Sequence, residues 1–190
     1  MFRLGSVLNV QHSGLWTVKP QYDVNQANQL NPHFIGLRDR AQREGDAMAR
    51  AFNASQVAYR SGQGARAKEL SEEGNTHKAE MERLNREASL WIFRENNRNS
   101  QSGDIDLHGL YVKEAVKFAE RAIIKAQRKG HSEIQFIVGK GLRSPSAQVT
   151  IRSAIEDLIS NYYRFDAAYH PDNAGVLVVR LKPDGALGCT

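Results

Sequence analysis

The hydrophobic pattern of this 190-residue chain changes at residues 100–103. Before this point, apolar residues recur every three or four positions, which is the period of packed α-helices. After it, short apolar runs alternate with helical stretches in the order strand, helix, strand, helix, strand, strand. That order predicts a small two-layer α/β domain with an antiparallel final strand, a βαβαββ sandwich long enough for its own core. We therefore expect a helical unit followed by an α/β domain.

Two helices joined by a tight turn are predicted before the change of pattern. The first should run from about Pro32 to Tyr59 and end at the glycine-containing turn formed by residues 61–64. The second places apolar or small residues at the alternating spacing of four and three that marks a helix–helix seam. These seam residues are Leu70, Gly74, His77, Met81, Leu84, Ala88 and Trp91. The prediction is an antiparallel helical hairpin whose small seam residues let the two helices approach closely.

The patterns divide the chain into five parts. We expect a disordered N-terminal segment (1–31), the helical hairpin (32–99), a linker (100–103), the α/β domain (104–183) and a tail (184–190). The first segment is rich in Asn, Gln and Ser and has no sustained period. Residues 1–22 contain no acidic residue, as in mitochondrial presequences, but their basic residues are sparse, so we favour a disordered tail.

Composition excludes several classes of protein. No apolar stretch approaches the roughly 20 residues that cross a bilayer, so no membrane partner is expected. The one cysteine, Cys189, allows neither an internal disulfide nor a cysteine-rich zinc site, and it fits a reducing, cytoplasmic location. The net charge of +5 is spread along the chain and forms no basic arm. Any affinity for nucleic acid must therefore come from the local placement of cations, and the oligomeric state is left open.

Two short apolar strands in the second half each run into a loop that carries polar groups. The first is Asp104–His108, followed by Gly109, and the second is Ile134–Val138, followed by residues 139–145. If the two strands are parallel neighbours, both loops open at the same edge of the sheet, where α/β proteins place ligands. The first loop offers acid–base groups and the second offers groups that bind phosphate. Their combination suggests a site for a phosphodiester.

His108 and Asp106 are the candidate catalytic residues. Side chains alternate along a strand, so both lie on one face, with Asp104 further back on that face. A histidine titrates near neutral pH and serves as general base or acid, while a carboxylate two positions away can orient its ring. Gly109 supplies the backbone freedom that a tight exit needs. The spacing fits a structural alternative equally well, in which Asp106 caps a backbone amide and His108 packs at a turn.

The second loop is the candidate phosphate-binding site. Its candidate residues, with one from the following helix, are Gly139, Lys140, Gly141, Arg143, Ser144 and Arg152. The glycines let backbone amides approach an anion, and the cations supply charge. Ser144 followed by Pro145 predicts a helix start, whose N-terminus adds N–H groups and a positive dipole. The alternatives stay open: an ordinary strand-to-helix turn for the loop, and a plain solvent-exposed arginine for Arg152.

A metal centre is the competing interpretation of Asp104, Asp106 and His108. Magnesium and manganese usually take carboxylates from several elements. The other strand ends offer only Asp166 and Asp172, which show no convergence. We therefore predict no dedicated metal site and no cofactor, with a divalent ion as the open alternative.

These residues resemble the Smr (small MutS-related) domain. Asp104–Leu110 and Val138–Ser144 resemble its two signature motifs, and the likeness continues through Arg152–Glu156 and Asp172–Val179. Residues 37–99 resemble the helical domain of unknown function that precedes Smr in many eukaryotic proteins. One departure concerns Arg143, because the family's second motif commonly has histidine there. Arginine keeps the positive charge but does not shuttle protons near neutral pH.

The resemblance implies a fold similar to the C-terminal domain of bacterial translation initiation factor three. It also implies nucleic-acid binding and, in many members, nicking or endonuclease activity on RNA, including messages on stalled ribosomes, or on branched DNA. The Asp-Leu-His motif associated with cleavage is present as Asp106-Leu107-His108. Our leading hypothesis is an Smr-type endonuclease in ribosome-linked RNA quality control, with RNA preferred to branched or nicked DNA. The rival hypothesis is a non-catalytic module that binds RNA or the ribosome.

Overall fold

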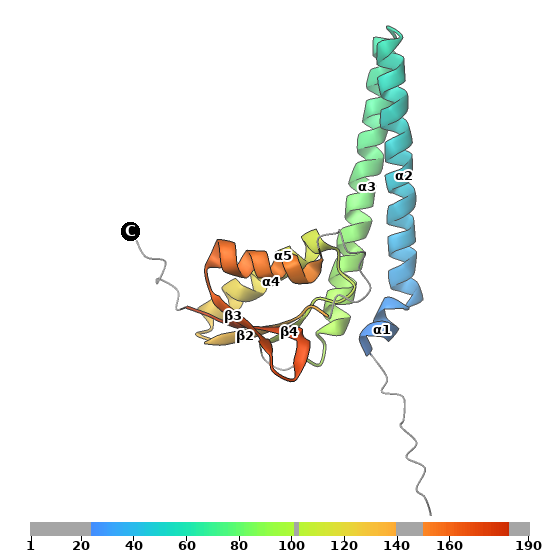
Figure 1. Cartoon of the computed structure of the whole chain (residues 1–190). Coiled ribbons are helices and arrows are strands. Elements are labelled where there is room, and N and C mark those ends of the chain that lie inside the picture. Colours follow the sequence, from blue (N-terminus) through green and yellow to red (C-terminus); the bar gives the residue numbers. More distant parts are fainter. Residues whose placement is uncertain (1–23, 101–102, 140–149, 183–190) are drawn as a thin grey trace, which may run out of the picture.

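The computed structural model describes residues 24–100, 103–139 and 150–182. A helical region leads into a four-stranded mixed sheet that is packed against further helices (Figure 1). The chain is therefore a mixed α/β protein with an N-terminal helical region, as the change of hydrophobic pattern predicts. The finer likeness to the initiation-factor domain stays a prediction. None of the described helices is both long and apolar enough to cross a membrane.

The long helices α2 (Pro32–Arg60) and α3 (Gly64–Asn96) run side by side (Figure 1). Between them the chain turns at Gly62, which has a φ of 75°. Gly74 of α3 lies so close to Phe52 of α2 that an added Cβ would be 2.8 Å from the ring. This is the close approach that the small residues of the seam predict.

A short helix, α1 (Val24–Gln29), precedes α2 and corrects one prediction. The sequence suggests disorder through residue 31, because these residues are polar and lack a period. Tertiary contacts hold the segment in place. The Asn28 amide donates to the side-chain oxygen of Asn96, 2.9 Å away at the end of α3. Gln29 packs against Gly109, where an added Cβ would lie 3.1 Å from the Gln29 side chain. Residues 1–23 lie outside the described part, so that portion of the prediction is untested.

The sheet has the strand order β1-β2-β4-β3. Its strands are β1 (Asp104–Asp106), β2 (Glu133–Ile137), β3 (Asp166–His170) and β4 (Asn173–Arg180). β1 and β2 pair in parallel, whereas β4 is antiparallel to both of its neighbours. The parallel pairing and the antiparallel final strand agree with the sequence-based expectation. Because β1 is an edge strand of this sheet, one side of its backbone has no strand partner among the described residues.

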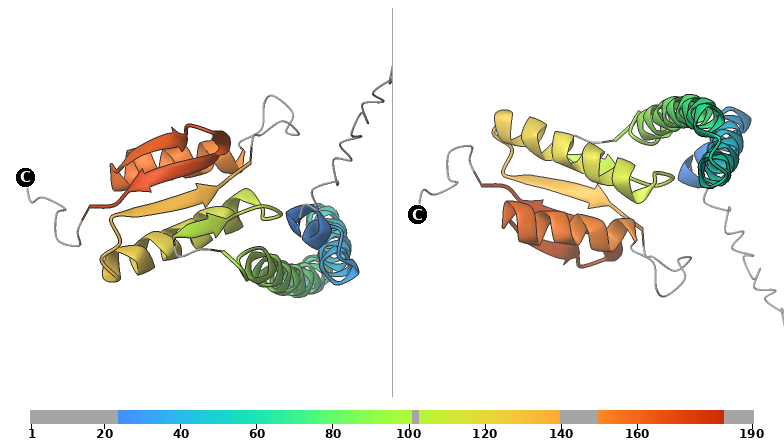
Figure 2. Two further views of the ribbon diagram at one scale, coloured as in Figure 1. Left: turned by 90° about the horizontal axis from the view of Figure 1, so that it is seen from below. Right: turned by 90° about the horizontal axis from the view of Figure 1, so that it is seen from above.

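Two helices, α4 (Val112–Arg128) and α5 (Ile151–Asp157), lie on the same face of the sheet, and α5 continues as the π-helical turn η1 (Leu158–Tyr163). Figure 2 shows both helices nearest the viewer from above, and the strands nearest from below. The core lies between the two layers. Its most deeply buried side chains include Leu107, Ile123, Phe136, Ile155, Ile159 and Val179. The sheet and these helices therefore form two layers around one core.

The predicted helix start before α5 is not tested, and the cap of α5 itself is one that the sequence analysis does not identify. Ser144 and Pro145 suggest a helix start, but they lie outside the described residues and α5 begins at Ile151. Its cap is Thr150, which is extended and exchanges hydrogen bonds with Ser153. The Thr150 N–H donates to Ser153 Oγ at 3.0 Å, and the Ser153 N–H donates to Thr150 Oγ1 at 3.2 Å. A serine partner is a weak signal in sequence, because capping boxes usually use Glu or Gln at this position.

Candidate catalytic site at the sheet edge

Asp106 and His108 form a hydrogen-bonded pair where β1 ends. One oxygen of the Asp106 carboxylate lies 2.8 Å from His108 Nδ1, and the same oxygen accepts the backbone N–H of His108, also at 2.8 Å. The Asp106 side chain is 5% exposed, whereas the His108 side chain is 31% exposed. An ionised carboxylate only accepts hydrogen bonds, so the neutral imidazole carries its proton on Nδ1 and its acceptor pair on Nε2. The buried acid therefore fixes both the orientation and the tautomer of an accessible base.

Gly109 makes the sharp exit from this strand. Its φ is 77°, which only glycine adopts without strain. An added Cβ would also lie 3.0 Å from the side chain of Ile92, near the end of α3. The turn after His108 is thus pressed against the helical region, and both the positive φ and the nearby Ile92 side chain favour glycine there.

Gly139, the first residue of the second loop, lies directly against His108. It has a φ of 73°, and an added Cβ would be 2.8 Å from His108 Nε2. The two loops therefore begin at the same edge of the sheet, as the parallel pairing predicts. The Gly139 N–H donates to the carbonyl of Gly175 at 3.1 Å, so this amide serves the strand pairing. Four other phosphate-binding candidates lie outside the described residues: Lys140, Gly141, Arg143 and Ser144.

Arg152 reaches the same edge from α5. Its guanidinium donates to the carbonyl of Gly139 at 3.4 Å and to the carbonyl of Ala174. It also lies over the ring of Tyr169, 4.5 Å from the centroid, and its buried Nε has no hydrogen-bond partner among the described residues. Arg152 is thus half-buried and braces the backbone beside His108. Its predicted contact with phosphate stays a prediction.

Tyr169 of β3 completes the packing around Arg152. Its hydroxyl donates to the Glu156 carboxylate on α5. Burial, together with this carboxylate, raises the pKa of Tyr169 to about 12. Both effects disfavour the phenolate, so the hydroxyl remains a proton donor through the physiological range.

Two asparagines at the end of α3 hold the segment that contains Asp106 and His108, and the sequence analysis does not identify them. The side-chain oxygen of Asn97 accepts the Asp106 N–H at 2.8 Å, and its amide donates to the Asp106 carbonyl at 2.9 Å. This amide therefore bonds the open side of β1 as a neighbouring strand would. Asn96 donates to the His108 carbonyl at 2.9 Å. Polar residues beside a linker give no distinct signal in sequence, because their stabilising role depends on which strand edge they contact in the fold.

A second contact joins the helical region to the same segment. Arg38 of α2 binds Glu114 through two hydrogen bonds, of 2.6 and 2.9 Å, with both side chains largely buried. Glu114 in turn accepts the N–H of Tyr111 at the start of α4, at 2.9 Å. Arg38 also lies over the Tyr111 ring, 4.0 Å from its centroid. The turn that follows His108 is therefore fixed by α2 as well as by α3.

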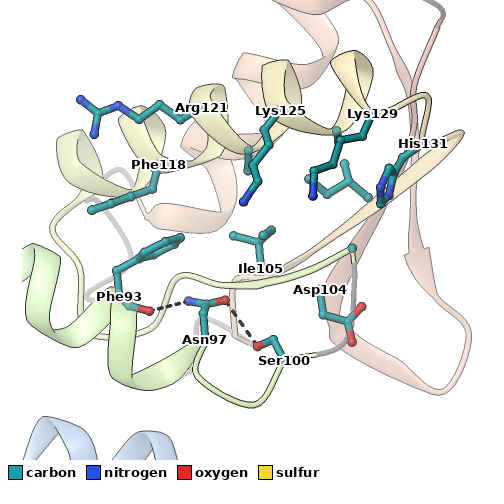
Figure 3. Close-up of a pocket in the computed structure, with 14 residues that line it drawn as sticks. Phe93, Asn97, Ser100, Asp104, Ile105, Phe118, Arg121, Lys125, Lys129 and His131 are labelled. Atoms are coloured by element: carbon teal, nitrogen blue, oxygen red, sulfur yellow. Dashed lines mark hydrogen bonds between the residues drawn. The ribbon is translucent and has the colours of Figure 1, made fainter.

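Asp104 stands apart from this pair. It is half-buried at the start of β1, where it lines a groove on the α4 side (Figure 3). Within the described ranges, no three His, Cys, Asp or Glu side chains gather as ligands for a metal ion. An imidazole oriented by a carboxylate, as at His108, is an arrangement that can serve general acid–base catalysis.

Comparison with known proteins assigns both halves of the chain. Residues 34–97 match a domain of unknown function, DUF1771, and residues 105–182 match the Smr domain. The chain therefore belongs to the Smr-domain proteins in which a DUF1771 domain precedes Smr. This confirms the resemblance of both halves. No solved structure matches the chain.

Three relatives give further detail. Endonuclease NBR9 of Saccharomyces cerevisiae is 35% identical over 146 residues, which are 77% of this chain and 59% of that protein. An Smr domain-containing protein of Schizosaccharomyces pombe is 36% identical over 119 residues, 63% of this chain and 58% of that protein. NEDD4-binding protein 2 of Homo sapiens is 30% identical over 138 residues, 69% of this chain and 8% of that protein. The chain thus spans under two thirds of the length of each of these relatives.

Proposed function

We propose that this protein is an endonuclease that cleaves phosphodiester bonds in nucleic acid and prefers RNA to DNA. The observation that carries the proposal is the Asp106–His108 pair, with His108 Nε2 facing Gly139 at the edge where the second loop begins. The name of one relative, an endonuclease, supports the activity. The preference for RNA and a place in ribosome-linked RNA quality control rest on the pairing of DUF1771 with Smr. A cytoplasmic location is part of the same proposal.

In this mechanism His108 acts as the general base. Nε2 takes the proton of the ribose 2′-OH, the 2′ oxygen forms a bond to phosphorus, and the bond from phosphorus to the 5′ oxygen breaks. The departing 5′ oxygen takes a proton from solvent. Asp106 holds the ring and stabilises the imidazolium that forms. Lys140 and Arg143, on the loop that starts at Gly139, would stabilise the negative charge on the phosphorane.

End-labelled oligonucleotides test this mechanism. Single-stranded RNA, duplex RNA, branched DNA and single-stranded DNA of the RNA sequence are incubated with the protein, with and without EDTA. We expect RNA fragments that end in a 2′,3′-cyclic phosphate, and no fragments from the matched DNA, which lacks the nucleophile. The His108→Ala variant should bind RNA without cutting it. Cleavage of DNA and RNA at equal rates would contradict the RNA preference and the 2′-OH mechanism.

The second candidate is a non-catalytic module that binds RNA or the ribosome. The observation that favours it is Arg143, which stands where the family's second motif commonly has histidine and which cannot shuttle a proton near neutral pH. RNA that is bound by the wild-type protein but stays intact would select this candidate.

A further inference from the structure

The outer surface of α4 carries a row of five cations at a constant spacing of four residues. They are Lys113, Lys117, Arg121, Lys125 and Lys129, here called the α4 row, and all are exposed. None of them has a salt bridge to another described residue. On α3, by contrast, the cations are balanced locally: Arg83 binds both Glu80 and Glu87, and Arg66 binds Glu69. On a solvated helix face, cations are usually paired with nearby carboxylates, as they are on α3. The cations of the α4 row therefore need a different explanation.

Two adjoining grooves follow this row. One lies between α3 and α4 and is lined by Lys113, Lys117 and Arg121, with Leu90 and Arg86 on its α3 wall. The other lies between α4 and β1 and is lined by Arg121, Lys125 and Lys129, with His131 at its end. Arg121 and Phe118 line both grooves. Positions four apart on an α-helix drift by about 40° per step, so the α4 row winds from the α3 side to the β1 side as the grooves do.

An aromatic pair lies at one end of the second groove (Figure 3). Phe93 of α3 and Phe118 of α4 are stacked, with centroids 4.0 Å apart and planes at 11°, and both are partly exposed. Figure 3 shows Lys125 and Lys129 pointing from α4 toward Ile105 of β1, across the space beside this pair. The hollow measures about 450 Å³, within the roughly 300–1,000 Å³ typical of small-ligand pockets. Cations bind the phosphates of a single-stranded nucleic acid, and an aromatic surface beside them can stack on its bases.

The carboxylates near the row leave its charge largely uncompensated. Glu114 is bound by Arg38, and Glu82 lies 4.0 Å from Arg86. Asp104 lies on the β1 wall of the second groove. The grooves are therefore positive overall. This charge favours a polyanion as the ligand over a protein surface whose acidic and basic residues balance.

The row begins beside the catalytic turn. α4 starts at Val112, four residues after His108, so Lys113 is close to the site in sequence and Lys129 is at the far end of the helix. Lys113 and Lys129 are separated by about 24 Å along the helix axis, the length of several nucleotides of an extended strand. A strand bound along α4 would therefore lead to His108.

We propose that the α4 row, with Phe93 and Phe118, is a track for single-stranded RNA that guides the substrate strand to His108. The proposal rests on the endonuclease function for its substrate, but binding can be measured without cleavage. Because Leu90, Arg86 and Phe93 belong to α3, the DUF1771 domain supplies one wall of the track.

The test is a binding titration with fluorescent single-stranded RNA that carries 2′-O-methyl groups and so resists 2′-OH attack. The test variant replaces Lys117, Arg121 and Lys125 with glutamine. The matched control makes the same change at Arg66, Lys68 and Lys78, which are exposed on α3 away from the grooves. We expect the test variant to bind roughly tenfold more weakly. The slope of log K against log salt should fall by about 2, because each of the three lost phosphate contacts contributes about 0.7. The control should bind as the wild type does.

A second variant tests the aromatic pair. Phe118→Leu keeps apolar volume but removes the stacking face, so it should weaken binding several-fold with an unchanged salt slope. Thermal melts of each variant confirm that the fold is kept. Wild-type affinity in both variants, or failure of the wild type to bind single strands, overturns the track. If the variants lose binding but the wild type cuts no RNA, the track stands and the endonuclease function fails.

Discussion

Asn97 offers a sharp test of how the helical region supports the Asp106–His108 pair. Its side chain makes four hydrogen bonds: it accepts the Asp106 N–H and the Ser100 hydroxyl, and it donates to the carbonyls of Asp106 and Phe93. Asp106 is only 3% exposed, so Asn97→Ala leaves a buried N–H and a buried carbonyl without partners. Each such group costs about 1–3 kcal/mol. Allowing for some entry of water, we expect a loss of about 2–4 kcal/mol in the free energy of unfolding.

Denaturant unfolding and thermal melts measure this loss. A destabilisation of this size should lower Tm by about 5–15 °C in a chain of this length. Asn97→Asp keeps the acceptor for the Asp106 N–H but loses both donors, so it should not rescue the protein. Asn75→Ala, at an exposed position on α3, is the control and should change stability by no more than about 0.5 kcal/mol.

Cleavage kinetics separate positioning from mere stability. Below the melting transition, a small shift of Asp106 tilts the His108 ring, and a displacement of about 1 Å can cost about 100-fold in rate. We therefore expect kcat to fall by about 10–100-fold while RNA affinity stays near the wild-type value. A variant that melts with the wild type and cleaves at the same rate would refute the reasoning.

Three further predictions concern individual groups. His108→Ala should lower the cleavage rate by about 10²–10⁴-fold and leave RNA affinity within a few fold, as single-turnover assays and titrations would show; full activity would remove His108 from the mechanism. Replacing Lys140 and Arg143 with alanine should weaken binding to unrelated sequences alike and lower the salt slope by about 1.4; a sequence-dependent loss would argue against phosphate contacts. The pKa of Tyr169 is raised from 10.0 to about 12, so its contribution to stability is present below pH 10 and is lost as pH rises through 12. Tyr169→Phe, which removes the bond to Glu156, should flatten the fall in stability between pH 10 and 12, and an unchanged alkaline limb would contradict this.

The parts of the site that the sequence predicts are those governed by local or pairwise rules. Alternation along a strand places Asp106 and His108 on one face, and parallel pairing brings their loop to Gly139. Thr150, the cap of the described helix α5, shows the limit, because its partner Ser153 gives only a weak signal in sequence. The predicted helix start at Ser144 lies outside the described residues and stays a prediction.

The residues that sequence analysis misses depend on contacts between distant segments. Asn97 matters because β1 is an edge strand with one open side, and α1 is ordered because Asn28 meets Asn96. The periodic pattern of α4 predicts its buried stripe but not which outer residues face a groove. The grooves along the α4 row therefore become visible only once α3 and β1 are placed beside it.

The amide of Asn97 on the open side of β1 has a consequence for whether the two domains can be separated in evolution. A three-residue edge strand with bare backbone groups is a template for pairing with other chains, which promotes aggregation. Here the residue that covers the edge of β1 is Asn97, which belongs to the preceding helical domain on the other side of the linker. An α/β half transplanted without the end of α3 would expose that backbone and would also lose the hydrogen bonds that hold Asp106. Gene rearrangements that separate the two domains should therefore survive only where another residue takes over the edge.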